Sequence, residues 1–412
     1  SVISILSIIE KMSSPLSQLS NDQWMDIIQY IGADDFKALR LAGNKAMCLS
    51  DPKLTSHLQL RMDRVPFFCE NDIHFSEGVI RQWLENRNRL VINDVDAKLS
   101  PSRVAYLVAN GFLDSVSEIL VHDCHHHRMI IEILSNLPNV KSLMLVSNQG
   151  DQTEALDELE AIIIHVGNMH SLTSLDIEFD TVVYGSRLSF LRNLQGLKHL
   201  RLVGFDLSVG ISSMEGLRDL ATLHLCHGNF YSSPNDDANE KDLMDLIGLT
   251  NVQRLHLEGF DCLKGVGLSP FSATGTIRDI VMKHCQELSD ECLASLGGMT
   301  NLNSPHFVLS SCDDIDVFDR ESLQHLNTLS SLKSLSLFYV LGDPTDLRAL
   351  PGLTALETLN IAFEETLSND EVESLCTQVL QIFPSLQRLR IFSEDSMDYS
   401  FLYGGLDVDY AT

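Results

Sequence analysis

From Val116 to the C-terminus, one spacing of apolar residues recurs eleven times, with the form Leu-x-x-Leu-x-Leu-x-x-(Asn/Cys). The clearest copy begins at Val140, continues through Leu143 and Leu145, and ends at Asn148. Successive copies start 23 to 32 residues apart. The starting residues are Val116, Val140, Leu172, Leu197, Leu220, Val252, Ile277, Ser304, Leu332, Leu356 and Leu386. One such unit cannot bury its own apolar face, so the copies must stack on one another.

Self-similarity at this period is the signature of a leucine-rich-repeat solenoid. Each repeat gives one strand to a parallel sheet and packs its leucines against its neighbours. We therefore predict an α/β solenoid with a curved parallel sheet and outer helices. Residues 285–296 resemble the cysteine-containing type of leucine-rich repeat, because a strand-ending Cys precedes Leu-Ser-Asp and a predicted helix. Such arrays are mostly recognition surfaces.

The array is predicted to begin with a divergent capping repeat at residues 87–115. Residues 89–93 form an apolar strand, and Ser100-Pro101 opens a helix that ends at Gly111. The solenoid is then residues 87–412. Residues 61–86 are expected to be a helical connector, and residues 1–14 an N-terminal helix or extension.

Cysteine usage and hydropathy favour a cytosolic or nuclear protein. The nine cysteines contain no Cys-x-x-Cys pair, and Cys124, Cys285 and Cys312 fall at the strand-ending position of their repeats. We expect these to be buried, reduced thiols. The longest uncharged apolar run, residues 2–9, is far shorter than the ~20 residues of a membrane span, and it lacks the flanks of a signal peptide.

The net charge of −28 is concentrated in the repeats, where residues 113–412 carry 44 acidic and 17 basic residues. Binding to a nucleic-acid backbone requires a basic surface. The composition therefore argues against a general nucleic-acid binder.

Residues 15–60 do not follow the repeat and predict two short helices. The first buries Trp24 and Ile27 and ends at Gly32, and the second begins after Asp34. This stretch resembles an F-box, with three departures: Leu19-Ser20 replaces Leu-Pro, Ala42-Gly43 replaces Val-Ser, and the Trp of the pattern is replaced around Ala46-Met47. The positions that match the F-box pattern are Leu19, Ile27, Ile28, Ile31, Asp35, Phe36, Leu39 and Arg40.

An F-box followed by leucine-rich repeats is a known family architecture, and the resemblance covers nearly the whole chain. It implies the substrate-recognition subunit of a Skp–cullin–F-box ubiquitin ligase. A Skp-type adaptor would contact Leu19, Ile27, Ile28, Ile31, Phe36, Leu39 and Arg40. The adaptor would in turn link the chain to a cullin. The alternative is a free-standing interaction scaffold whose N-terminal helices only cap the array.

Neither catalysis nor a bound metal or cofactor is predicted. The tract from His122 to His127 has no second Cys/His pair at zinc-ligand spacing, so we expect a solvated loop there. No phosphate-binding glycine motif or nucleophile elbow occurs in the sequence.

The concave face of the sheet is the candidate target-binding surface. Strand alternation places the third, fifth and seventh residues of each repeat there. These 33 positions hold 5 of the 17 basic residues and 5 of the 13 histidines of the repeats, an enrichment over chance. The predicted target-binding residues are His199, Arg201, His224, Arg254, His256 and Lys283. The alternative is an ordinary surface composition.

Five of these side chains come from three adjacent strands, so they are expected to converge on one anionic group. The predicted target is a protein with an acidic or phosphorylated segment. Histidines with pKa values near ~6.5 would add positive charge on acidification. Binding is therefore expected to tighten below about pH 6.5.

Overall fold

The computed structural model divides into two compact units, Ser1–Leu172 and Thr173–Thr412. It describes residues 60–61, 84, 88–92, 100–122, 128–147, 153–207, 210–227, 243, 245–260, 268–283, 290–303, 307–310, 320–338, 341, 344–363, 368–392, 399–403 and 406–411. The predicted N-terminal segment and the F-box-like module up to residue 59 lie outside these residues. So do all the predicted adaptor-binding residues, namely Leu19, Ile27, Ile28, Ile31, Phe36, Leu39 and Arg40.

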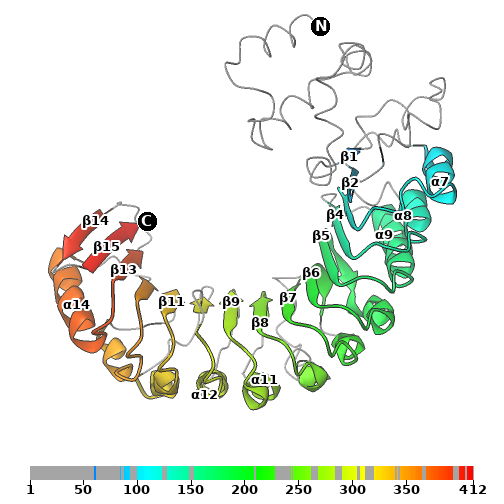
Figure 1. The fold of residues 1–412 in the computed structure, drawn as a ribbon. Helices are drawn as coiled ribbons and strands as arrows, with labels where there is room; N and C mark the ends of the chain where they lie inside the picture. Colours follow the sequence, from blue (N-terminus) through cyan, green and yellow to red (C-terminus); the bar gives the residue numbers. More distant parts are fainter. Residues whose placement is uncertain are drawn as a thin grey trace, which may run out of the picture. The chain divides into compact units, whose positions relative to one another are not determined.

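The first unit contains a parallel sheet in the order β1-β2-β3-β4 (Figure 1). The strands are β1 (Leu60–Arg61), β2 (Arg89–Ile92), β3 (Glu118–Val121) and β4 (Ser142–Ser147), and the helices are α7 (Pro101–Ala109), α8 (Arg128–Leu134) and α9 (Thr153–Val166). The predicted strand and helix of the capping repeat are confirmed as β2 and α7. Leu60 pairs with Leu90, so the ladder begins one strand before residue 87.

The second unit continues the same design. Its strands are β5 (Ser174–Tyr184), β6 (His199–Asp206), β7 (Thr222–His227), β8 (Arg254–Glu258), β9 (Asp279–Lys283), β10 (Phe307–Ser310), β11 (Ser334–Phe338), β12 (Thr358–Ala362), β13 (Arg388–Phe392), β14 (Tyr399–Tyr403) and β15 (Leu406–Ala411). They stand in sequence order except that β15 lies between β13 and β14. Every pair is parallel except β14–β15. That closing hairpin was not predicted, because it does not carry the repeat.

Short helices follow the strands of this unit and lie on the outer side of the sheet (Figure 1). They are η5 (Gly185–Asn193), η6 (Ile211–Met214), η7 (Asp245–Gly248), α11 (Ser269–Thr274), α12 (Asp290–Gly297), α13 (Arg320–Leu323), η9 (Gln324–Thr328), η10 (Pro344–Ala349) and α14 (Asn369–Ile382). Across the described residues, we find no helix with the length and apolar content that crossing a bilayer requires.

The repeated leucines form the core between the sheet and the outer helices. Leu200 and Leu202 of β6 are almost fully buried, and Leu200 pairs with Leu223, the equivalent leucine of β7. Full burial of one such side chain contributes about 1.5–3 kcal/mol. The intervening residues, such as Arg201, point to the concave face. The fold is the predicted leucine-rich-repeat array.

A second set of contacts joins consecutive repeats. Asn251 and Ser385 stand immediately before the first residue of a repeat, and Asn301 stands three residues before Ser304. Each donates a side-chain hydrogen bond to a backbone carbonyl of the preceding repeat. Asn301 Nδ2, for example, lies 2.6 Å from the carbonyl oxygen of Gly275. These bonds satisfy carbonyls that the turns would otherwise leave without a partner.

Gly204 interrupts β6 with a backbone that other residues rarely adopt. Its φ is +83°, and the register between β6 and β7 shifts between Val203 and Phe205. A Cβ at this position would lie 2.0 Å from the carbonyl oxygen of Phe179. Glycine is therefore required for the close approach of the two strands. The bulge also brings the buried rings of Phe179 and Phe205 to a centroid distance of 5.6 Å.

Three cysteines among the described residues, Cys226, Cys292 and Cys376, are buried thiols that form no disulfide. Cys124, Cys285 and Cys312, for which burial was predicted, lie outside the described residues, as do His125–His127.

Candidate functional site

The concave side of β5–β9 carries its side chains in three rows, because parallel strands in register place equivalent residues side by side. The first row is Ser174, His199, Thr222, Arg254 and Asp279, the second is Asp176, Arg201, His224, His256 and Val281, and the third is Glu178, Val203, Cys226, Glu258 and Lys283. Adjacent strands lie about 4.8 Å apart. Side chains of one row can therefore contact each other across strands.

Arg201 forms two ion pairs with the neighbouring strand β5. Its Nη1 atom donates to Asp176 Oδ1 at 2.9 Å and to Glu178 Oε2 at 2.6 Å. Burial opposes the charge of Arg201, but its hydrogen bonds to the two carboxylates and their negative charges together outweigh burial and raise the pKa of the guanidinium. Burial also raises the pKa of Asp176, despite the opposing hydrogen bond and charge of Arg201. The positive charge of Arg201 is therefore compensated by carboxylates of the same chain.

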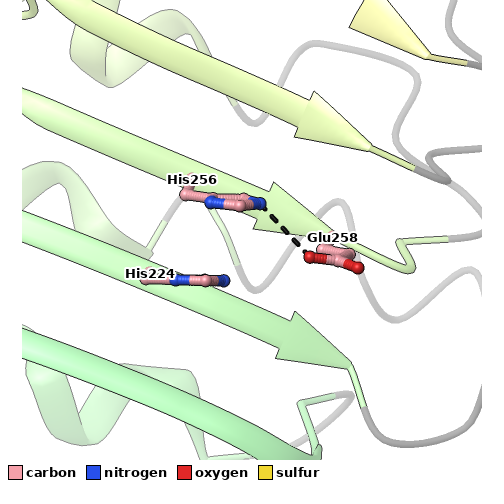
Figure 2. A group of neighbouring side chains, drawn as sticks. All are labelled: His224, His256 and Glu258. Carbon is pink, nitrogen blue, oxygen red and sulfur yellow. Dashed lines mark ion pairs between the residues drawn. The ribbon is translucent and has the colours of Figure 1, made fainter. Parts of the chain in front are cut away.

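His224 and His256 stack on one another across β7 and β8. Their ring centroids lie 3.8 Å apart and the ring planes differ by 7°. Figure 2 shows the two imidazoles side by side, with Glu258 beyond the end of the His256 ring. His256 Nε2 lies 3.2 Å from Glu258 Oε2. The three side chains form one compact cluster, which we call the imidazole–carboxylate cluster.

The two Nε2 atoms of this cluster are buried and lack hydrogen-bond partners among the described residues. The contact of His256 with Glu258 is close enough for an ion pair, but the ring N–H does not align with the carboxylate oxygen. Buried polar atoms are normally satisfied in native structures, so two adjacent exceptions require an explanation.

Burial, together with the charges of His256 and Arg201, lowers the pKa of His224 from 6.5 to about 4. His224 is therefore neutral at physiological pH. The expectation that acidification below pH 6.5 would charge the histidines of this face does not hold for His224. The physical reason is its partly buried position between other basic side chains, which only the packed sheet creates.

Near the imidazoles, the pKa of the Glu258 carboxyl is lowered and the pKa of the Cys226 thiol is raised. The close contact with His256 lowers the pKa of Glu258, against the effect of burial. Burial and, to a smaller extent, the charge of Glu258 raise the pKa of Cys226 to about 11. Glu258 is therefore an anion and Cys226 a protonated thiol at neutral pH.

The remaining predicted residues lie around the cluster. His199 Nδ1 lies 3.1 Å from Thr222 Oγ1 in the first row. Arg254 is exposed and has no ion-pair partner among the described residues. Lys283 is also exposed and stands opposite Glu258 in the third row. Arg254 and Lys283 are the cations of this patch that face solvent.

The structure brings five predicted residues, His199, Arg201, His224, Arg254 and His256, onto the adjacent strands β6–β8, with Lys283 on β9. Their electrostatic character differs from the expectation that all five arginine and histidine side chains would converge on one anionic group, because Asp176 and Glu178 already pair with Arg201. The sequence did not reveal that these carboxylates pair with Arg201. Comparing the same position in neighbouring repeats would have paired Asp176 with Arg201 and His224 with His256.

The imidazole–carboxylate cluster also offers metal-ligand atoms. One donor atom from each of His224, His256 and Glu258 lies within 4.8 Å of the other two. Among the described residues, these three form the group of His, Cys, Asp or Glu side chains that could hold a metal ion. Sequence reasoning missed it because the two histidines are 32 residues apart and match no motif.

Comparisons with known proteins return solved structures only. No protein-family model and no curated protein sequence matches the chain. An internalin from Listeria monocytogenes is 17% identical with a TM-score of 0.39, covering 72% of this chain and 79% of its own. A TLR13–ssRNA13 complex is 15% identical with a TM-score of 0.38, covering 75% of this chain and 46% of its own.

A third similar structure is the Arabidopsis receptor kinase HAESA in complex with the peptide hormone IDA and the co-receptor SERK1. It is 16% identical with a TM-score of 0.34, and the match covers 63% of this chain and 40% of that one. Because the identities and TM-scores of these matches are low, the repeat architecture of this chain is assigned from the register of its own leucines.

Proposed function

We propose that this protein is a non-catalytic, protein-binding leucine-rich-repeat molecule that holds a protein target on the concave face of β5–β9. The observation that carries the proposal is the ordered surface there. Three rows of mostly polar side chains stand in register, and Arg254 and Lys283 face solvent. An extended surface of fixed polar groups is suited to reading a partner's polar groups.

The proposed target presents an acidic or phosphorylated segment. Arg254 would supply the forked guanidinium that binds carboxylate or phosphate oxygens, and Lys283 would supply a second charge. Arg201 acts in this scheme mainly by positioning Asp176 and Glu178, since both of its ion pairs are already made. The acidic remainder of the array would disfavour other anionic partners through like-charge repulsion.

The finer form of the proposal is a substrate receptor of a Skp–cullin–F-box ubiquitin ligase in the cytosol or nucleus. Its support is the F-box resemblance of residues 15–60, followed by a repeat array. The competing proposal is a free-standing scaffold whose N-terminal helices cap the array. The two differ in whether a Skp-type adaptor binds.

The deciding experiment is a binding assay between the full chain and a purified Skp-type adaptor at physiological salt. We expect a stable complex that is lost in the double variant Ile31→Glu/Leu39→Glu, because charge is placed on the predicted docking surface. Circular dichroism of the variant should keep the wild-type signal. If the wild-type chain never retains the adaptor, the scaffold proposal is correct.

Target recognition is tested by screening the chain against acidic and phosphorylated peptides. Arg254→Glu should weaken the binding of the tightest-binding peptide by about 2–5 kcal/mol if the arginine contacts the anion while desolvated. Arg218→Glu is the matched control, because Arg218 is exposed but precedes β7 rather than lying on the concave face. Equal loss in both variants would indicate a long-range charge effect and would exclude a specific site at Arg254.

A further inference from the structure

The imidazole–carboxylate cluster has the donor atoms of a transition-metal site. When zinc is bound by protein nitrogen and oxygen at about 2.0–2.2 Å in tetrahedral geometry, its ligand atoms lie about 3.3–3.6 Å apart. His256 Nε2 and Glu258 Oε2 already lie 3.2 Å apart. The donor atoms of the three residues lie within 4.8 Å of one another. The three donors therefore lie close enough together for side-chain rotation to direct them at one ion.

The two imidazoles have ring nitrogens that the fold leaves without a hydrogen bond. His224 Nε2 and His256 Nε2 are both buried and have no hydrogen-bond partner among the described residues. An imidazole nitrogen in this state costs free energy unless something binds it. A metal ion would satisfy both nitrogens and the Glu258 carboxylate at once.

We propose that His224, His256 and Glu258 bind one divalent transition-metal ion, with zinc as the reference ion, on the concave face of β7 and β8. Two nitrogen donors and one oxygen donor suit zinc and its neighbours in the first transition series better than calcium or magnesium, which prefer oxygen ligands. Three protein ligands leave at least one coordination position of a tetrahedral ion open. This inference does not depend on the proposed target or adaptor.

The backbone positions the three ligands before any ion arrives. His224 and His256 are direct partners in the register of β7 and β8, and Glu258 is two residues further along the same face of β8. Because the rings are stacked with nearly parallel planes, coordination must turn each imidazole about its χ2 angle until the two lone pairs meet. The nearby positive charge of Arg201, which would repel a cation, is compensated by Asp176 and Glu178.

The test begins with the full chain freed of metal by a chelator, dialysed, and titrated with zinc chloride by calorimetry. We expect one saturable site per chain. Changes outside a metal's direct ligands already cost 10–100-fold in affinity, so His256→Gln should weaken zinc binding by at least about tenfold. His224→Gln should have the same effect.

Two controls distinguish this site from other histidines. His199→Gln should leave zinc affinity unchanged, because His199 lies in the next row and bonds to Thr222. A variant with His125, His126 and His127 all changed to Gln should also keep the site. If that triple variant loses the zinc while His224→Gln and His256→Gln bind it normally, the proposal is wrong.

X-ray absorption at the zinc edge on the wild-type chain tests the ligand set even if a variant fails to fold. The proposal requires two imidazole nitrogens and a carboxylate oxygen at about 2.0–2.2 Å. A sulfur neighbour at about 2.3 Å would contradict the assigned ligands. The absence of stoichiometric zinc binding in the wild-type titration would overturn the proposal.

Discussion

Arg201 on β6 donates to Asp176 on β5 at 2.9 Å, and the same Nη1 atom reaches Glu178 at 2.6 Å. The side chains of Arg201, Asp176 and Glu178 are 31%, 29% and 35% exposed, so water screens the three charges only in part. Removing the cation would leave two like charges close together in a partly desolvated place. The network therefore contributes to the stability of the β5–β6 edge.

Arg201→Met should destabilise the second unit by about 1–3 kcal/mol, because charged groups lose their partner without regaining full hydration. Urea unfolding followed by circular dichroism measures this change. The triple variant Asp176→Asn/Glu178→Gln/Arg201→Met should recover part of the loss, since no unpaired charge remains. Equal stability of the wild type and Arg201→Met would show that the ion pairs contribute nothing.

The stability of metal-free protein should decrease as the pH falls from 6.5 towards 4. The pKa of His224 is about 4 in the folded state against 6.5 ordinarily. Between these values the unfolded chain binds the extra proton, so the folded state is disfavoured as the pH falls. Glu258, whose folded pKa is lowered from 4.5, adds a loss in the same direction below that value.

The contribution of His224 is isolated by comparing melting temperatures of the wild-type chain and His224→Phe in the presence of a chelator. The variant should lose less stability than the wild type across this pH range, because phenylalanine cannot take up the proton. Parallel melting curves for the two proteins at every pH would show that His224 does not titrate as described.

Gly204→Ala should destabilise the second unit by about 2–4 kcal/mol, combining strain at φ +83° with a clash against backbone. The added Cβ would meet the carbonyl oxygen of Phe179 at 2.0 Å. Gly216→Ala is the matched control, because a Cβ there has no atom within 4 Å. Thermal unfolding compares the two. Similar melting temperatures for both variants would contradict the assigned bulge.

Cys226 should be alkylated slowly in the native protein. Its pKa is raised from 9.0 to about 11, so at pH 8 its thiolate fraction is about 100-fold below that of an ordinary cysteine. Iodoacetamide labelling followed by peptide mass spectrometry gives the rate at each cysteine. Cys376, whose pKa burial also raises, should react slowly as well. If Cys226 is labelled in the native protein as fast as in urea, the thiol is accessible and the prediction is wrong.

Much of the array could be predicted because its cause is local. Leu200 and Leu202 are buried because alternation in a strand places them on one side, and the repeat period brings Leu223 and Leu225 beside them. The closing hairpin β14–β15 was missed because no repeat marks it. Gly204 carried no signal either, since the requirement for glycine comes from Phe179 on another strand.

The sequence by itself determined the repeat period, the buried leucines and the residues that reach the concave face, because all three follow from spacing along one chain. Only the tertiary structure decided the chemistry of that face. The register of β5–β8 placed Asp176 beside Arg201 and His224 beside His256. Charge neutralisation, ring stacking and the lowered pKa of His224 arise from distances between strands, and spacing within one strand does not specify these distances.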